Sequence, residues 1–360
     1  MTRCQPAQGI PHMKRFSSSQ SFLLFLSTVL LATPLAVAGP LEIHWIDVEG
    51  GAATLILTPA GESILIDTGL PQRYQVERIH DHLRDVAKLK HLDFLVVTHY
   101  DLDHHGGAAQ LSTMIPIRTV YDNGRFEKMV NDPGEEYFSF AAGNRVVINP
   151  GDRIPLQGTA AAPAPVLRCV GTRQVFEQPP PGALRNTAIC KTLRTKSPDT
   201  SENANSIVLL LEHGDFRFYD AADLTWNLES QLVCPVNLIG EVDVYQVTHH
   251  GLSSSNNAAV VQSLQPSVTV MNNGPTKGCH PETFATLKAT RSIQANYQLH
   301  KNQRPDGNVN NTDDAYIANT EKDTSGNYIR LSVDPNGSTF TVHIPANGHS
   351  RTFRSKSGSR

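Results

Sequence analysis

One short stretch constrains this chain more than any other, because it joins a buried strand to a dense group of ionisable side chains. The continuous apolar run LDFLVVTH (92–99) predicts a strand buried on both faces, and YDLDHHGG follows it directly. Three histidines and two aspartates fall within residues 99–105. Such a group is costly to bury without a cation, so it indicates a divalent-metal site. Taken alone, the stretch also fits a solvated polar loop.

The spacing of these side chains suits a metal site. His99, Asp101, Asp103 and His104 stand at positions i, i+2, i+4 and i+5. Alternate residues of a chain leaving a strand share one face, and His104 follows where the chain is expected to turn into a helix. Imidazole and carboxylate together are ligands for zinc or manganese.

Two further strands are predicted to end in the same chemistry. The stretch NSIVLLLEHGDFRFYDAADLT (205–225) predicts a hairpin that leads to Asp220 and Asp223, and VDVYQVTHHG predicts a strand that ends in His249 and His250. In an α/β sheet, ligands gather at the carboxyl ends of strands. We therefore expect the three strand ends to meet at one site, which a solvated loop does not explain.

The remaining patterns predict one α/β domain. They indicate strands over 41–48, 117–124 and 267–274, hairpins over 52–69 and 328–344, and helices over 72–90, 224–234, 257–265 and 281–291. The helix over 72–90 is expected to bury one face, formed by Val76, Ile79, Leu83 and Val86.

The order of these elements favours two sheets packed between helices. The domain is expected to span 39–350, with an insertion near 125–200 that holds a helix, short strands and a long irregular loop. A basic C-terminal tail is expected over 351–360.

The first 38 residues are expected to be a leader. A signal peptide over 13–38 is indicated by the basic pair Lys14 and Arg15, the apolar stretch 22–32, and small residues before the cleavage site at Gly39. The alternative is a membrane anchor, but the apolar stretch is short for a span of about 20 residues. The protein is therefore expected to be periplasmic or secreted, with no stable membrane span after cleavage.

Loss of the leader changes the charge of the chain. The leader carries Arg3, Lys14 and Arg15 and no acidic residue, so its removal takes the formal net charge from −3 to −6. An acidic chain does not favour nucleic acid as a partner through bulk electrostatics, although a local basic patch stays open.

Four cysteines remain after the leader: Cys169, Cys190, Cys234 and Cys279. An even number in an exported protein indicates disulfides. Cys169 and Cys190 flank one proline-rich loop and form the expected pair. The alternative is four unpaired, buried thiols.

The motifs together resemble those of a known family. The H-x-D-x-D-H stretch at 99–104 resembles the H-x-H-x-D-H motif of metallo-β-lactamase-fold hydrolases, with Asp101 in place of a histidine. With HWIDVEGGAATLILTPAGESILIDTG (44–69), VTHHG and GCHP in order, the chain is similar to the hydrolase domain of ComEC-type DNA-uptake proteins and their secreted stand-alone relatives over about 40–300. This resemblance implies a four-layer αββα sandwich.

The resemblance also implies two divalent ions, zinc or manganese. It makes Asp103, His104 and His249 the ligands of one ion, and it makes His99 and Asp101 ligands of the other. The second of these sites lacks a third histidine that is common in the family, so it has few ligands. Asp223 would bridge the two ions.

Other residues take supporting roles in the resemblance. Asp67 would hold the loops of the site by hydrogen bonds, and His105 would lie beside the ligands. His250 would support the site or donate a proton, which makes Asp103, Asp223 and His250 the expected catalytic residues. His280 would line the pocket or cap the helix that starts at Pro281.

The function implied is hydrolysis by an exported, metal-dependent enzyme that uses a metal-activated hydroxide, on a phosphodiester or related ester. One alternative is a lactam, lactone or carboxylic ester, although Asp101 leans against the zinc β-lactamases and makes manganese a rival to zinc. Another is a non-catalytic binding protein on a decayed hydrolase fold. Glu49 replaces a glycine of the ComEC pattern and is expected to disfavour a polyanionic substrate.

Overall fold

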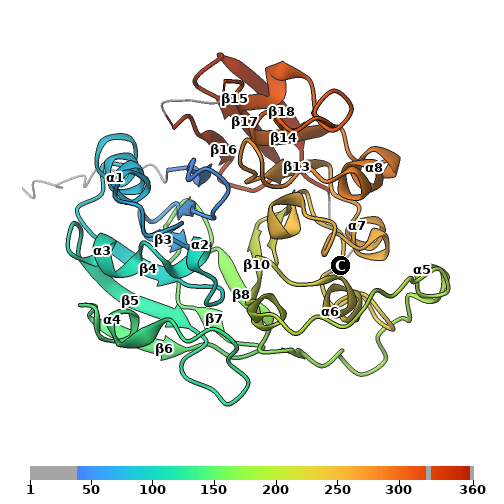
Figure 1. The fold of residues 1–360 in the computed structure, drawn as a ribbon, viewed down its shortest axis with the longest axis horizontal. Coiled ribbons are helices and arrows are strands. Elements are labelled where there is room, and N and C mark those ends of the chain that lie inside the picture. The colour runs from blue at the N-terminus through green and yellow to red at the C-terminus, as the bar shows by residue number, and fades with distance from the viewer. Residues whose placement is uncertain (1–38, 322–325, 357–360) are drawn as a thin grey trace, which may run out of the picture. The chain divides into compact units, whose positions relative to one another are not determined.

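A computed structural model describes residues 39–321 and 326–356, so the predicted leader lies outside the described residues. The described chain forms two nine-stranded sheets with helices on their outer faces (Figure 1). None of the helices in this part of the chain is long and apolar enough to cross a membrane.

The first sheet has the strand order β18-β17-β16-β1-β2-β3-β4-β5-β6. It is antiparallel from β18 to β3 and parallel from β3 to β6, so the carboxyl ends of β3 and β4 lie at the same edge. In sheet order the strands are His349–Arg354, Thr339–Ile344, Ile329–Val333, Leu41–Trp45, Thr54–Leu57, Ser63–Ile66, Leu92–Val96, Ile117–Asp122 and Asn144–Val147.

The second sheet has the order β15-β14-β13-β12-β11-β10-β8-β7, with β9 paired to β8. Strands β11 to β15 are parallel, and β11 and β12 therefore also end at one edge. In sheet order, with β9 last, the strands are Ile317–Asn319, Ala295–His300, Val268–Met271, Val244–Gln246, Phe216–Asp220, Val208–His213, Val166–Thr172, Arg153–Ile154 and Val175–Phe176.

The helices are short. The α-helices α1 to α8 are Arg73–Asp81, Leu102–His105, Ala108–Ser112, Gly134–Ser139, Thr187–Cys190, Trp226–Gln231, Ala258–Leu264 and Pro281–Ala289. A π-helix, η1, continues α1 over His82–Val86, and the 3₁₀-helices η2, η3 and η4 are Glu202–Asn205, Thr248–Gly251 and Asp314–Tyr316.

Three apolar clusters define four layers. One cluster lies between the sheets and includes Ile43 and Ile66 of the first sheet and Leu209 of the second. A second cluster packs α1, α3 and α4 on the outer face of the first sheet, and a third packs α6, α7 and α8 on the second sheet. The predicted four-layer αββα sandwich is therefore confirmed, and the buried apolar runs are what both inner faces require.

The local patterns predicted most strands and helices around the site, with one exception on the first helix. The expected helix over 72–90 is α1 followed by η1, and Val76, Ile79 and Leu83 are buried. Val86 is 40% exposed, against the expectation, because the wider π turn rotates the end of the helix away from the sheet.

The segment 125–200 needs a correction, because it is not simply an insertion. It supplies β6 to the first sheet and β7, β8 and β9 to the second. Strand β8 pairs with β10 and places Cys169 in the core between the sheets. The expected tail over 351–360 is corrected in part, since β18 extends the first sheet to Arg354.

The expected Cys169–Cys190 disulfide is wrong. Cys190 pairs with Cys234, with an S–S distance of 2.11 Å, whereas Cys169 and Cys279 are free and buried. The Cys169 side chain on β8 packs in the apolar core between the sheets, whereas Cys190 lies at the end of α5 and pairs with Cys234.

Candidate metal centre

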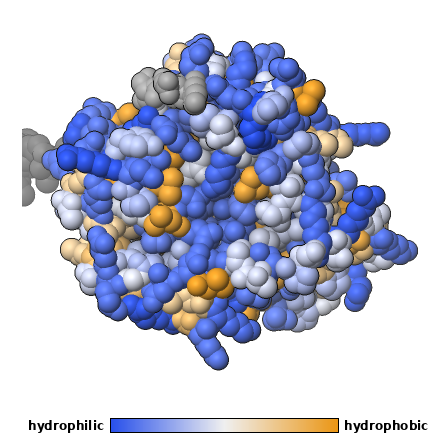
Figure 2. All heavy atoms as spheres, in the orientation of Figure 1, coloured by the Kyte–Doolittle hydropathy of each residue, from blue (hydrophilic) through white to orange (hydrophobic). Residues whose placement is uncertain are grey.

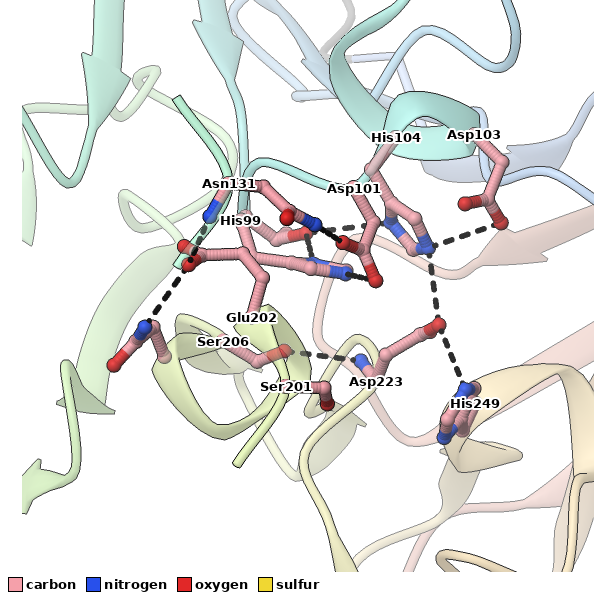
Figure 3. Close-up of polar contacts among 12 residues, drawn as sticks. His99, Asp101, Asp103, His104, Asn131, Ser201, Glu202, Ser206, Asp223 and His249 are labelled. Atoms are coloured by element: carbon pink, nitrogen blue, oxygen red, sulfur yellow. Dashed lines mark hydrogen bonds and ion pairs between the residues drawn. The ribbon is translucent and has the colours of Figure 1, made fainter. Parts of the chain in front are cut away.

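Four strand ends from both sheets bring the predicted residues together. Asp67 follows β3, and the stretch 99–104 follows β4 in the first sheet. Asp223 follows β11, and the histidine pair 249–250 follows β12 in the second sheet. Figure 3 shows His104 and Asp223 pointing toward one another across the junction of the two sheets.

The centre of the site is a group of four residues. Asp103, His104, Asp223 and His250 each offer one ligand atom, and these atoms lie within 4.8 Å of one another. The Asp223 Oδ2 atom is 3.3 Å from the Nε2 atoms of His104 and His250. His250 Nε2 is also 3.3 Å from Asp103 Oδ2. Two carboxylates and two imidazoles at this spacing suit a divalent cation.

Hydrogen bonds aim both imidazoles into this group. His104 Nδ1 lies 2.7 Å from Asp67 Oδ2, and His250 Nδ1 lies 3.1 Å from the Asn272 carbonyl oxygen. A carboxylate and a carbonyl accept hydrogen bonds, so each Nδ1 donates and each Nε2 is left to bind a cation. The donor set therefore fits the metal that the resemblance implies.

Asp67 ties together the loops that carry the site. Its Oδ1 accepts from the Thr98 backbone N–H at 2.8 Å, and its Oδ2 accepts from the Thr98 hydroxyl at 2.7 Å. Asp67 is 1% exposed and has a positive φ of 62°. Its three acceptor contacts fix His104 and the start of the 99–104 loop.

The backbone around the histidine pair is strained. His249 and His250 have φ values of 54° and 52°, and Ala222 has a φ of 48°. Each such conformation costs a non-glycine residue about 1–2 kcal/mol. The His249 N–H donates to the Ala222 carbonyl at 2.8 Å, which couples the two strained turns. Strain of this kind clusters at functional sites.

The two neighbouring histidines take different places in the structure. His250 lies in the group with Asp103 and His104, where the resemblance implies His249, and the metal-binding role of His249 stays a prediction. His249 instead directs Nε2 to Asp223 Oδ2 at 3.3 Å, while its Nδ1 lies 3.0 Å from the Ser254 hydroxyl. Two consecutive left-handed residues hold the ring centroids 6.2 Å apart, and local sequence could not assign them.

His99 and Asp101 form a second, smaller group. His99 Nε2 is 3.6 Å from Asp101 Oδ2, and it is buried without a hydrogen-bond partner. An unpartnered buried imidazole nitrogen is costly, and a cation would satisfy it. Asp223 Oδ2 contacts the Nε2 atoms of His104 and His249, each at 3.3 Å.

The electrostatics of the site favour a positive charge at its centre. Burial alone would lower the pKa of His104, but the Asp223, Asp67 and Asp103 carboxylates raise it well above its usual value. Burial would raise the pKa of Asp223, but His104, His249 and His250 hold it well below its usual range. The carboxylates therefore stay ionised, and their negative charge needs a cation at the centre of the site.

Lys277 is a site residue that the sequence patterns did not single out. Its Nζ contacts Asp103 Oδ2 directly, and its side chain is 34% exposed. The loop that carries it packs on the site, because a Cβ at Gly278 would lie 1.9 Å from the His250 carbonyl oxygen. The only signal was a lysine one residue before GCHP.

The remaining predicted residues lie beside the centre. His105 packs against the rings of Tyr100 and Tyr137, with centroid distances of 6.4 Å and 5.5 Å, and burial lowers its pKa to about 4. His280 precedes α8 without capping it by its side chain. Its Nδ1 instead accepts from the Ser253 backbone N–H at 3.2 Å, which steadies the loop after His250.

The charge of Glu49 is paired. Its carboxylate lies 3.0 Å from Arg78 Nη1 and accepts from the Tyr74 hydroxyl at 2.8 Å. The expectation that Glu49 disfavours a polyanionic substrate stays a prediction, and Arg78 partly offsets the charge on which it rests.

Comparison with known proteins supports the resemblance. Residues 46–168 match the model of the metallo-beta-lactamase superfamily, which confirms the resemblance drawn from the motifs over this part of the chain. Members of this superfamily are in general metal-dependent hydrolases. The strand ends that carry Asp67 and the 99–104 motif fall within the match, while Asp223 and His250 lie beyond it.

A curated relative is more specific. ComE operon protein 3 of Bacillus subtilis is 25% identical over 259 residues, which cover 66% of this chain but only 29% of that protein. This chain therefore corresponds to less than a third of its relative.

Solved structures of similar arrangement are distant. The diiron β-hydroxylase CmlA of Streptomyces venezuelae is 14% identical, with a TM-score of 0.41 over 72% of this chain and 52% of that one. A diphosphatase of the PhnP family is 14% identical, with a TM-score of 0.38 over 71% of this chain and 94% of that one. Scores this low carry no functional argument.

Proposed function

We propose that this protein is an exported metal-dependent hydrolase that cleaves a phosphodiester or a related ester. The observation that carries the proposal is the buried group of Asp103, His104, Asp223 and His250, whose ligand atoms lie within 4.8 Å of one another. The superfamily match over residues 46–168 supports the hydrolase class.

The chain would bind the ions and arrange the substrate around them. Bound divalent ions supply Lewis acidity and a nucleophile at neutral pH. Asp103 and Asp223 supply the negative charge that holds them, and His104 and His250 direct Nε2 toward the same point. His249 is the more exposed of the histidine pair and contacts Asp223. Burial lowers its pKa to about 4, so near neutral pH it would act beside the reacting atoms as a neutral hydrogen-bonding group.

Lys277 favours an anionic substrate. Its ammonium group stands at the Asp103 carboxylate, at the edge of the metal group. When cations neutralise Asp103, this ammonium group is available to a negatively charged oxygen of the substrate. A phosphodiester offers such an oxygen, whereas a lactone does not.

A substrate panel tests the proposal. Protein loaded with zinc or manganese is assayed for metal content and then with bis-p-nitrophenyl phosphate, single-stranded DNA, a lactone and nitrocefin. We expect turnover of a phosphodiester and none in Asp103→Ala, which should also lose metal. Turnover of the lactone or nitrocefin alone would contradict the proposed substrate class. A protein that binds no metal and shows no activity would be a binding protein.

Hydrolysis of a lactone or another carboxylic ester is the second candidate. Leu102, between two expected metal ligands, is 53% exposed, and Val130 is 54% exposed. Figure 2 shows hydrophobic residues on both sides of a hydrophilic central strip on this face, which would suit an apolar acyl group. Lys277→Met separates the candidates, because it should raise KM for an anionic ester at least tenfold and leave KM for a neutral ester unchanged.

Export is proposed from the sequence of the leader. The test is expression of the full chain in a Gram-negative host, followed by fractionation and N-terminal mass analysis. We expect mature protein that begins at Gly39 in the periplasm or the medium. Full-length protein in the cytoplasm or the membrane would contradict it.

A further inference from the structure

We infer that Asn131 and Glu202 are positioning residues that fix Asp101 for a second divalent ion. The inference rests on the proposed metal-dependent function, and it explains how this chain works with an aspartate where the resembling family has a histidine.

Asp101 needs outside support to act as a ligand. It stands at the start of α2 but does not cap the helix with its side chain, which is 23% exposed. Its Oδ2 faces His99 Nε2 at 3.6 Å, and its Oδ1 accepts from Asn131 Nδ2 at 2.5 Å. Without Asn131, the carboxylate would be free to rotate toward solvent, because nothing else in the described chain is recorded holding Oδ1.

Asn131 stands on an exposed loop between β5 and α4, and a buried carboxylate holds that loop. The Glu202 Oε2 atom accepts from the backbone N–H groups of Val130 at 2.7 Å and Asn131 at 3.3 Å. Glu202 is fully buried, and its Oε1 has no hydrogen-bond partner. Burial of an acidic side chain costs several kcal/mol, so its retention beneath this loop calls for a role.

The helix that carries Glu202 is fixed to both halves of the metal centre. After η2, the Ile207 N–H donates to the Thr98 carbonyl at 3.0 Å, directly before His99. The Ser206 hydroxyl accepts from the Asp223 backbone N–H at 3.3 Å. Figure 3 shows this helix below His99 and beside Asp223, with Glu202 reaching toward Asn131. Glu202 therefore connects the Asn131 loop, through η2, to the strand ends that carry the proposed ligands.

This arrangement makes the effect of the two residues selective. Neither residue has a recorded contact with Asp103, His104 or His250, which form the first ion site. Loss of Asn131 or Glu202 should therefore lower the affinity for the ion beside His99 and Asp101 and leave the affinity for the other ion unchanged. A general loss of structure would lower both affinities together.

The experiment counts ions and measures each affinity in the full mature protein. Metal-free wild type, Asn131→Ala, Asn131→Asp and Glu202→Gln are titrated with Mn²⁺ and Zn²⁺ by calorimetry, and bound metal is counted by mass spectrometry. We expect two ions in wild type. In the variants, the weaker affinity should fall about 10–100-fold while the stronger stays within threefold. Asn131→Asp tests the donor itself, because it replaces the amide that donates to Asp101 Oδ1 with a carboxylate of similar size.

The control is Glu135→Gln, an exposed carboxylate on the same segment that contacts Arg125 instead. It should bind two ions as wild type does. If Glu202→Gln does not fold, Asn131→Ala on the exposed loop still decides the question. Two ions at wild-type affinity in the Asn131 variants would overturn the inference and leave the proposed function standing. One ion in active wild type would overturn the inference alone, whereas no ion in wild type would remove both.

Discussion

At the scale of single residues, the site depends on which nitrogen of each imidazole faces its centre. Asp67 and the Asn272 carbonyl each engage one Nδ1, so that two Nε2 atoms converge on Asp223. The orientation of His104 is thus decided by a residue that is not itself a proposed ligand, and the same holds for His250.

Asp67→Asn should weaken metal binding about 10–100-fold, because residues that orient a ligand have effects of this size. Both carboxylate oxygens of Asp67 accept hydrogen bonds, from three donors in total. In an asparagine, one of these oxygens is replaced by an N–H₂ group, which cannot accept from the donors that face it. The measurement is a competition titration against a coloured chelator. The control Asp93→Asn changes a carboxylate that accepts from Ser63 instead, and it should bind metal as wild type does. Equal affinity in Asp67→Asn would refute this role.

Paired alanine variants decide between the two histidines. His250→Ala should lose the ion of the four-residue group, because His250 Nε2 lies 3.3 Å from both carboxylates. His249→Ala should keep that ion and lose turnover. Metal counts and kcat for the two variants check this. The reverse pattern would restore the assignment made from sequence.

At the scale of elements, η1 joins α1 to the first sheet through a histidine pair. His82 Nε2 lies 2.8 Å from His44 Nδ1 on β1, and His44 Nε2 lies 3.0 Å from Glu42 Oε2. Burial lowers the pKa of His82 to about 3, and nearby His44 lowers it as well. The unfolded chain, with an ordinary histidine pKa, binds this proton more readily.

The contribution of His82 to stability is therefore complete above about pH 6.5 and is lost as the pH falls toward 3. At pH 5 the loss is about 2 kcal/mol, from 1.36 kcal/mol per pH unit. Urea unfolding at pH 7.5 and pH 5 should show that His82→Gln loses about 2 kcal/mol less than wild type over this interval. His91→Gln, on the surface, should match wild type. An unchanged pH dependence in His82→Gln would exclude this contribution.

The disulfide links α5 to the segment that follows α6. Cys190 and Cys234 are 44 residues apart, and the chain-entropy model gives a bridge of this length about 4 kcal/mol. Reduction should lower the free energy of unfolding by up to this amount, measured in urea with and without reductant. Cys169→Ala should leave that difference unchanged. Peptide mapping of unreduced protein should find Cys190 joined to Cys234, and a bridge to Cys169 would contradict the structure.

At the scale of the whole described domain, the metal centre joins the two sheets. Asp103 and His104 come from the first sheet, and Asp223 and His250 come from the second. A cation shared by these four residues would hold the sheets together and offset the repulsion between two buried carboxylates. Metal binding and stability should therefore be linked.

Chelation should lower the melting temperature by about 5–10 °C. Metal at 100 times its Kd adds about 2.7 kcal/mol to the free energy of unfolding. The melting temperature of a domain of this size shifts by about 2–4 °C for each kcal/mol. Thermal melts with EDTA, and after Zn²⁺ or Mn²⁺ is restored, measure the effect. Asp103→Ala should respond less than wild type to both treatments, because it loses a ligand of the four-residue group. A wild-type melt that EDTA leaves unchanged would show that no metal stabilises the fold.

The sequence by itself determined the strands and the chemistry at their ends. Continuous apolar runs such as 92–99 need burial on both faces wherever they lie, and the polar side chains after them can only collect at a strand edge. Two sheets packed between helices, and most members of the metal group, follow from these local rules. The motif at 99–104 was therefore the strongest single indication of the metal site.

Only the tertiary structure decided the pairings that span long stretches of chain. His104 meets His250 across 146 residues, Lys277 meets Asp103 across 174, and Glu202 holds the Val130 backbone across 72. The same holds for the choice of Cys234 over Cys169. Local patterns predict which residues are buried and which are polar. They do not predict which of two similar neighbours reaches a distant partner, because that depends on the direction of the backbone. The packing of the two sheets sets this direction.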